Sequence, residues 1–217
     1  MPRAASQPNR RRAPSRPGAA EPFDADYYRR FYGDPQTRVS DAAAVRKLAT
    51  FVASYLRYLE LPVRTILDVG CGMGHWRTAA AELWPRARWF GVEYSVHLCE
   101  RFGWTQGSIV DLDVRAATGR TGFDLVVCQG VLQYLDDAAA AKAIGNLGRW
   151  CTGALYLEAL TAADWRVNCD RTRTDGAVHL RRGAWYRTRL QRHFRSCGGG
   201  VFASRRTGVT LFELEGA

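Results

Sequence analysis

The sequence predicts an α/β fold with a seven-stranded, mostly parallel sheet and helices on both faces. Three observations support this. Short apolar runs alternate five times with segments of helical periodicity, a pattern typical of parallel sheets covered by helices. Two further apolar segments near the C-terminus predict antiparallel strands, including the last strand of the sheet. In the stretch 65–76, a buried strand opens through three glycines into a helix.

Composition divides the chain of 217 residues into a tail and one domain. Residues 1–22 combine proline and arginine and have no large apolar residue after Met1, so we expect disorder there. The domain spans 23–217. We expect a helical cap at 23–62, a ligand-binding core at 63–159, and a substrate loop with the last helix and strands at 160–217.

The first residues and the cysteines indicate the compartment. The arginine-rich start has no apolar stretch behind it and no amphipathic period, which argues against a secretory signal and disfavours an organellar transit peptide. No apolar run reaches the length of about 18 residues that suggests a membrane span. The six cysteines form no C-x-x-C pair, so we expect neither a zinc site nor disulfides, and a cytoplasmic location.

The spacing of apolar residues, the capping residues and the glycine and proline positions predict where the helices and strands lie. We expect the helix caps to be Asp24 or Asp26, Ser40 or Asp41, Ser95, and Asp136 or Asp137. The predicted helices cover residues 24–33, 41–60, 75–84, 96–102, 137–150 and 183–195. The predicted strands cover 64–69, 88–93, a short piece of 104–113, 123–128, 153–159, 200–205 and 208–215.

The glycine turn is the clearest functional signal. Gly70, Gly72 and Gly74 follow Asp68 with the spacing G-x-G-x-G. Glycine allows a tight turn and close approach of a ligand to the backbone, and a helix N-terminus offers free N–H groups. The spacing differs from the G-x-G-x-x-G of dinucleotide sites, and no Lys-Ser/Thr pair of a phosphate loop follows.

Polar residues follow the ends of the neighbouring predicted strands. Glu93 ends the second strand, where a carboxylate accepts hydrogen bonds from a ribose diol. Ser108 follows the third strand and Gln129 the fourth. Parallel sheets bind ligands outside the carboxyl ends of their strands. These positions therefore predict one nucleoside-binding site.

This set of motifs resembles the class I S-adenosylmethionine-dependent methyltransferases, which have a Rossmann-like sheet. The acid before G-x-G-x-G corresponds to Asp68, the ribose acid to Glu93, and the adenine loop to residues 107–109. The apolar strand and polar loop under the sulfonium correspond to residues 123–135. The resemblance covers about residues 63–159 and implies an S-adenosyl-L-methionine cofactor.

The resemblance also implies the cofactor-binding residues. Many relatives have Asp at the position of Ser108, so either Ser108 or Asp111 serves the adenine. Tyr94 and Ile109 are expected to enclose the adenine ring, and Tyr27, Tyr28 and Tyr32 to form either a lid or plain packing. The expected cofactor-binding set is Asp68, Gly70, Cys71, Gly72, Gly74, Glu93, Tyr94, Ser108, Ile109, Gln129, Gly130 and Tyr28.

Methyl transfer from a sulfonium is a direct displacement, in which the protein supplies alignment. The sequence assigns no catalytic residue, and His75, Glu158 and His179 are weak candidates for a base. No metal ligand set is expected.

The acceptor is expected to be a small molecule, methylated on O or N. The loop after the fourth strand reads CQGV, without the Asp/Asn-Pro-Pro-aromatic sequence of nucleic-acid amino methylation. Arg181, Arg182 and Arg187 are candidates for holding a carboxylate or phosphate, so an anionic substrate is one expectation.

Two alternatives stay open. The net charge of +10, with arginine concentrated in the tail and after residue 163, allows an RNA- or protein-directed methyltransferase, although nucleic acid is disfavoured. The other alternative is a non-catalytic protein that binds S-adenosyl nucleosides and assists another enzyme. No membrane partner is expected.

Overall fold

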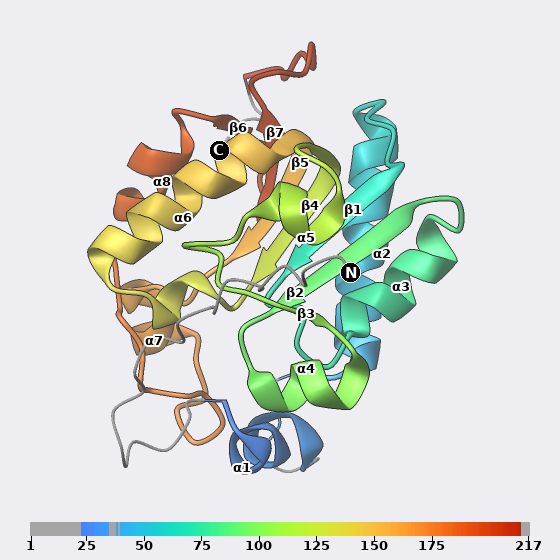
Figure 1. Ribbon diagram of the computed structural model, residues 1–217. Helices are drawn as coiled ribbons and strands as arrows, with labels where there is room; N and C mark the ends of the chain where they lie inside the picture. The colour runs from blue at the N-terminus through green and yellow to red at the C-terminus, as the bar shows by residue number, and fades with distance from the viewer. Residues whose placement is uncertain (1–22, 35–37, 39, 214–217) are drawn as a thin grey trace, which may run out of the picture.

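The computed structural model describes residues 23–34, 38 and 40–213, and these form a seven-stranded sheet with helices packed against it (Figure 1). The strand order is β3-β2-β1-β4-β5-β7-β6. The order reverses between β1 and β4, where the chain switches from one half of the sheet to the other. The predicted fold class is confirmed.

The first five strands are parallel, while β7 is antiparallel to both β5 and β6. Register aligns Asp68 of β1 with Gly91 of β2 and Val127 of β4. The strands are β1 Thr65–Val69, β2 Arg88–Glu93, β3 Thr105–Gln106, β4 Phe123–Gln129, β5 Cys151–Glu158, β6 Phe194–Ser196 and β7 Val201–Ser204.

Polar side chains begin most of the helices. Asp24, Asp41, Ser95 and Asp136 accept a hydrogen bond from the first helical turn, as the sequence predicts. The helices are α1 Ala25–Tyr28, continued by the π-helical turn η1 Arg29–Gly33, then α2 Ala42–Tyr58, α3 His75–Leu83, α4 Val96–Phe102, α5 Val114–Thr118, the 3₁₀ turn η2 Leu132–Tyr134, α6 Asp137–Trp150, α7 Ala162–Val167 and α8 Gly183–Leu190.

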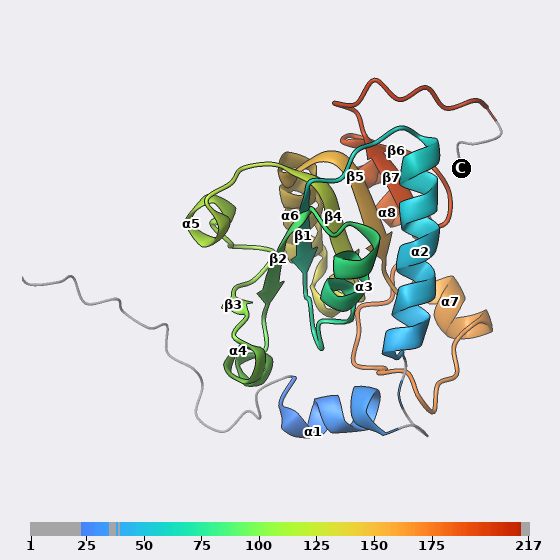
Figure 2. The ribbon, with the colours of Figure 1, turned by 90° about the vertical axis from the view of Figure 1, so that its right-hand side faces the viewer.

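Helices lie on both faces of the sheet (Figure 2), and the layers between them and the sheet are apolar. Residues of α2 and α3 pack with Ile66, Leu125 and Val127 on one face. Residues of α6 and α8 pack with Leu67 and Val126 on the other. Successive residues of a strand point to opposite faces, so a central strand with both faces covered is continuously apolar.

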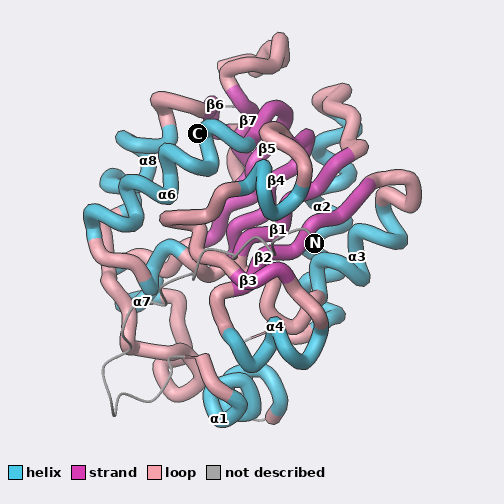
Figure 3. The backbone as a smooth tube through the Cα atoms, viewed as in Figure 1, coloured by secondary structure: helices cyan, strands magenta, loops and turns pink. Residues whose placement is uncertain are grey.

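The carboxyl ends of the parallel strands meet at one edge of the sheet, and α1 lies across that edge (Figures 1 and 3). The chain brings residues 23–33 there before it forms any strand. This arrangement places the first helix over the turns that follow β1, β2 and β4.

Two predicted boundaries near the C-terminus are wrong. The last helix ends at Leu190 rather than 195, and residues 208–213 form no strand. Gly198, Gly199 and Gly200 all have positive φ, and they make the turn between β6 and β7. The antiparallel hairpin is therefore formed by β6 and β7, and it begins earlier in the chain than the predicted pair of strands at 200–205 and 208–215. The predicted tail, 1–22, lies outside the described residues.

Two short helices were not predicted. α5 follows a cap by Asp113, and α7 begins in a capping box between Thr161 and Asp164. Both lie in stretches too short for a helical apolar period. Across the described ranges, none of the helices combines the length and apolarity that crossing a membrane requires.

Candidate active site

The glycine turn after β1 has an open side. Gly70, Gly72 and Gly74 all have positive φ, at 73°, 50° and 76°. A Cβ on Gly70 would lie 2.4 Å from Val131, whereas a Cβ on Gly72 would find only a backbone oxygen, 3.9 Å away. The space beside Gly72 is therefore open to a ligand, as the sequence predicts for a cradle.

Trp104 holds this turn in place. Its indole nitrogen donates to the carbonyl oxygen of Gly72 at 3.0 Å, and its ring would lie 2.9 Å from a Cβ on Gly74. The amides of Gly70 and Cys71 both donate to the carbonyl of Val92, at 2.8 and 3.1 Å. Sequence reasoning missed Trp104, because no pattern distinguishes this tryptophan from the others of the chain.

Glu93 joins the end of β2 to the glycine turn. Its Oε2 accepts a hydrogen bond from the Gly72 amide at 2.8 Å. Its Oε1 accepts from the amides of Tyr94 and Ser95, both at 2.9 Å. The carboxylate is buried, and these three amides fix it beside the cradle, where a ribose diol is expected.

Asp68 is a buried acid without a full set of partners. Its side chain is 2% exposed, and Oδ2 has no hydrogen-bond partner in the described part of the chain. Burial, aided by the charge of Glu93, raises the pKa of Asp68 to about 8. The Trp89 side chain lowers the pKa of Asp68 in part, although the geometry between its Nε1 and the Asp68 carboxyl is not that of a regular hydrogen bond.

A second group of polar side chains connects β4 with β5 and α3. Trp76 Nε1 donates to Gln129 Oε1 at 2.8 Å, and Gln129 Nε2 donates to Glu158 Oε2 at 3.0 Å. The Tyr156 hydroxyl donates to the same Glu158 oxygen at 3.1 Å. Gln129 is thereby held at the strand switch. The sequence singled out Gln129 and Glu158 but missed their connection through Trp76 and Tyr156.

The N-terminal segment covers the site. Ser95 Oγ donates to the Phe23 carbonyl at 2.7 Å, which ties this segment to α4. The Tyr27 and Tyr134 hydroxyls form a hydrogen bond of 2.8 Å, which ties it to the loop after β4. Tyr28 is buried and its ring stacks on His97, with centroids 6.4 Å apart. The segment therefore bridges the exits of β2 and β4.

The loop after β3 is held in place by a residue of α6. Asn146, a buried residue of α6, donates to the carbonyls of Ile109 and Val110 at 2.6 and 3.1 Å. Ser108 Oγ accepts from the Val110 amide at 3.2 Å. Asp111 is exposed and pairs with Lys142 at 2.7 Å. The choice between Ser108 and Asp111 as the adenine partner stays a prediction.

Other predicted residues have different surroundings. Tyr94 is 56% exposed, whereas Ile109 is buried, so the enclosure of the adenine between them stays a prediction. Cys71 is buried, and Gly130 has a φ of 70° and donates its amide to the Glu158 carbonyl. His75 begins α3, and burial lowers its pKa.

His179 is anchored through its backbone, because its amide donates to the Gln133 carbonyl at 2.7 Å. In the described ranges, the rings of His75 and His179 make no hydrogen bond with Glu158. The role of His75, Glu158 or His179 as a base therefore stays a prediction.

Arg181 has internal partners and is not an open anion site. Its guanidinium is buried, with Nε 2.6 Å from Asp137 Oδ1. Its other nitrogens donate to the carbonyls of Leu132 and Leu135 and to the hydroxyl of Tyr186. Arg181 thus fixes the loop after β4 to the start of α8. Arg182 and Arg187 are exposed.

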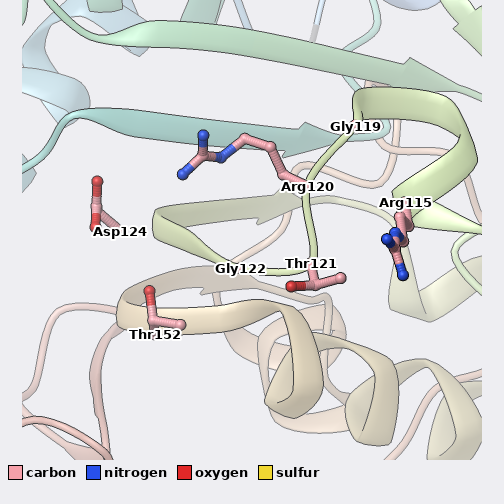
Figure 4. A pocket seen from close by; sticks show the side chains of 7 residues that line it. All are labelled: Arg115, Gly119, Arg120, Thr121, Gly122, Asp124 and Thr152. Carbon is pink, nitrogen blue, oxygen red and sulfur yellow. The ribbon is translucent and has the colours of Figure 1, made fainter.

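A hollow of about 690 Å³ lies at the opposite edge of the sheet, at the starts of β4 and β5 (Figure 4). It contains none of the residues above. Its lining is Arg115, Gly119, Arg120, Thr121, Gly122, Asp124 and Thr152.

Residues 66–153 match the family model described as a methyltransferase domain. They include the glycine turn, Glu93 and Gln129. The chain therefore contains a class I methyltransferase domain. S-adenosylmethionine is the cofactor of this class. The residues present fit it, because the methyltransferase domain offers a buried, unpartnered carboxyl oxygen on Asp68 and an open cradle at Gly72.

Relatives agree with this assignment. The chain is 30% identical over 109 residues to a malonyl-[acyl-carrier protein] O-methyltransferase of Legionella pneumophila, which covers 48% of this chain and 38% of the relative. It is 34% identical over 77 residues to a trans-aconitate 2-methyltransferase of Azoarcus sp., covering 35% and 30%. The chain thus spans less than two fifths of either relative.

Solved structures show the same fold. An O-methyltransferase family protein from Burkholderia thailandensis is 17% identical, with a TM-score of 0.52, and the similarity covers 77% of this chain and 59% of that one.

Proposed function

We propose that this chain transfers a methyl group from S-adenosylmethionine to an O or N atom of a small molecule. The observation that supports this most is the link between Glu93 and Gly72. The buried Glu93 carboxylate is thereby tied to the open glycine cradle, and the buried, unpartnered oxygen of Asp68, near the end of β1 just before this turn, adds to the support. A nucleoside with an amino-acid head group needs this set of acceptors and free backbone groups.

When bound, the cofactor supplies an electrophilic methyl group on a sulfonium. The chain's own residues bind and orient. Glu93 accepts from the ribose, and Asp68 accepts from the positive head group. Gln129 is held by hydrogen bonds to Trp76 and Glu158, and it provides a polar group for the cofactor where the strand order reverses. Such alignment contributes on the order of 7–11 kcal/mol to a displacement reaction.

The cover supports a small acceptor. Residues 23–33 lie across the strand ends, and the Tyr27–Tyr134 hydrogen bond closes one side. A macromolecular substrate would have to displace these contacts. The names of the two curated relatives point to acceptors that carry carboxyl groups. For such an acceptor, Arg182 and Arg187 remain the candidate cations.

We further propose a cytoplasmic location. All six cysteines are free, and four of them are buried. Free thiols of this kind fit a reducing compartment.

The test is transfer of label from methyl-labelled S-adenosylmethionine into a cell extract fractionated by size. We expect label in the low-molecular-mass fraction, with none from the Gly72→Val variant. Label in RNA or protein would support the macromolecular alternative. Cofactor binding without transfer to any fraction would support the non-catalytic alternative.

A further inference from the structure

Two adjoining hollows lie at the edge of the sheet opposite the glycine cradle, where β4 and β5 begin (Figure 4). The first has a volume of about 690 Å³ and the second of about 450 Å³. Both are lined by Thr121, Gly122 and Thr152, so they form one continuous depression. Volumes in this range suit a small molecule.

Four arginines line this depression, two in each hollow. Arg115 lies on α5, and Arg120 lies in the loop before β4. Arg149 lies near the end of α6, and Arg206 follows β7. Among the described residues, none of the four forms an ion pair. Segments that are far apart in the sequence thus bring four positive charges without an acidic partner to one place.

These guanidinium groups have hydrogen-bond donors left for a ligand. Arg120 Nε is buried and has no partner in the described part of the chain. Arg206 Nη1 donates to the Arg149 carbonyl at 3.1 Å, and Arg149 Nη2 donates to Asn146. Because a guanidinium has five N–H donors, these contacts position Arg149 and Arg206 without using up their donors. A buried donor without a partner costs free energy, and a bound acceptor would remove that cost.

Asp124 is an acid in the lining, but its carboxylate already has donors. Its Oδ2 accepts hydrogen bonds from the amides of Arg64 and Thr65 and from the Thr65 hydroxyl, each at 2.9 Å. These three donors lie at the start of β1 and offset part of the negative charge. Thr121 and Thr152 add neutral hydroxyl groups to the lining. The depression is therefore positive overall and favours an anion.

We propose that this depression binds a small phosphorylated molecule, whose phosphate groups are held by the four arginines. A planar guanidinium matches two phosphate oxygens with two parallel hydrogen bonds. Two arginines in each of two adjoining hollows suit a ligand with more than one phosphate group. The site lies at the opposite edge of the sheet from the glycine cradle, and the proposal does not depend on the methyl transfer.

The test is titration of pyrophosphate into the full chain by calorimetry at low salt, because salt screens exposed charges. We expect a Kd below about 1 mM. Arg115→Gln with Arg120→Gln should weaken binding at least about tenfold, because charged donors to phosphate are lost. Neither side chain belongs to an ion pair among the described residues, so the midpoint of urea unfolding should stay that of the parent. Arg206→Gln, in the second hollow, should weaken binding at least about threefold.

Arg86→Gln with Arg166→Gln is the matched control, because it removes the same charge from two exposed arginines that line neither hollow. It should keep the affinity of the parent. No binding by the parent, unchanged affinity of Arg206→Gln, or equal losses in both double variants would overturn the proposal. An RNA oligonucleotide that binds more tightly than pyrophosphate through the same arginines, measured by fluorescence anisotropy, would also overturn it, since the surface would then serve a polymer.

Discussion

Glu93 Oε2 lies 2.8 Å from the Gly72 amide nitrogen and accepts its hydrogen bond across 21 residues of sequence. The bond makes the end of β2 and the turn after β1 a single unit. Both carboxylate oxygens are engaged with backbone amides, so the acid is positioned before any ligand arrives. Preorganisation of this kind lowers the ordering cost of binding.

The first prediction concerns the charge of Glu93. Glu93→Gln keeps the shape but replaces charge-assisted hydrogen bonds, which are worth about 1.5–3 kcal/mol each, by weaker ones. We expect the Kd for S-adenosylhomocysteine to rise about 10- to 100-fold, measured by calorimetry. Glu100→Gln, an exposed acid of α4, is the control. Equal affinities of the two variants would contradict the assignment.

The second prediction separates backbone strain from loss of the cradle. Gly72 and Gly103 both have positive φ, and a Cβ on Gly103 would meet nothing within 4 Å. Alanine at either position should reduce the free energy of unfolding by about 1 kcal/mol, since the strain is similar.

Of these two variants, only Gly72→Ala should lose affinity for S-adenosylhomocysteine, because its methyl group enters the open side of the turn. Urea unfolding and calorimetry on both proteins measure the two effects. A parallel loss of affinity in Gly103→Ala would mean that strain alone explains it.

The third prediction concerns Arg181 as a structural residue. Arg181→Met leaves the carbonyls of Leu132 and Leu135 without their donors, at about 1–3 kcal/mol each. We expect a loss of about 3 kcal/mol in the free energy of unfolding, from urea titration. Asp137→Asn should cost less than about 1 kcal/mol, because that carboxylate is 72% exposed. A stable Arg181→Met variant would return Arg181 to the list of candidate substrate ligands.

The fourth prediction is a pH dependence from Asp68. Its pKa is raised from 3.8 to about 8 in the folded chain, so between these values the folded state binds the extra proton. The free energy of unfolding therefore falls as the pH rises from about 4 to about 8. Asp68→Asn should remove this contribution. Urea titrations of parent and variant at several pH values measure it, and parallel curves would contradict the assignment.

The sequence predicted the residues at the strand ends better than the residues that hold them in position. Asp68, Gly72 and Glu93 are found where strand ends place them, because parallel strands fix their own carboxyl edge. Trp104 holds the glycine turn and Asn146 holds the loop after β3, each by hydrogen bonds to residues far away in the sequence. Local sequence patterns do not reveal such contacts. The predicted strand 200–205 agrees with β7 apart from its first and last residues, but the sequence does not reveal that Gly198, Gly199 and Gly200 form the turn before it, with positive φ.

Within the described ranges, residues 23–33 are joined to the rest of the chain by fewer hydrogen bonds than the strands beneath them are to one another. Described contacts of residues 23–33 with the rest of the chain include one hydroxyl pair 107 residues apart in sequence, one serine-to-carbonyl bond and aromatic ring contacts. The strands beneath have regular ladders and buried faces. Segments with few anchors open at a lower free energy than the core. We therefore expect amide hydrogens of 25–33 to exchange with deuterium well before those of β1, so the site would be able to open and close while the sheet stays folded.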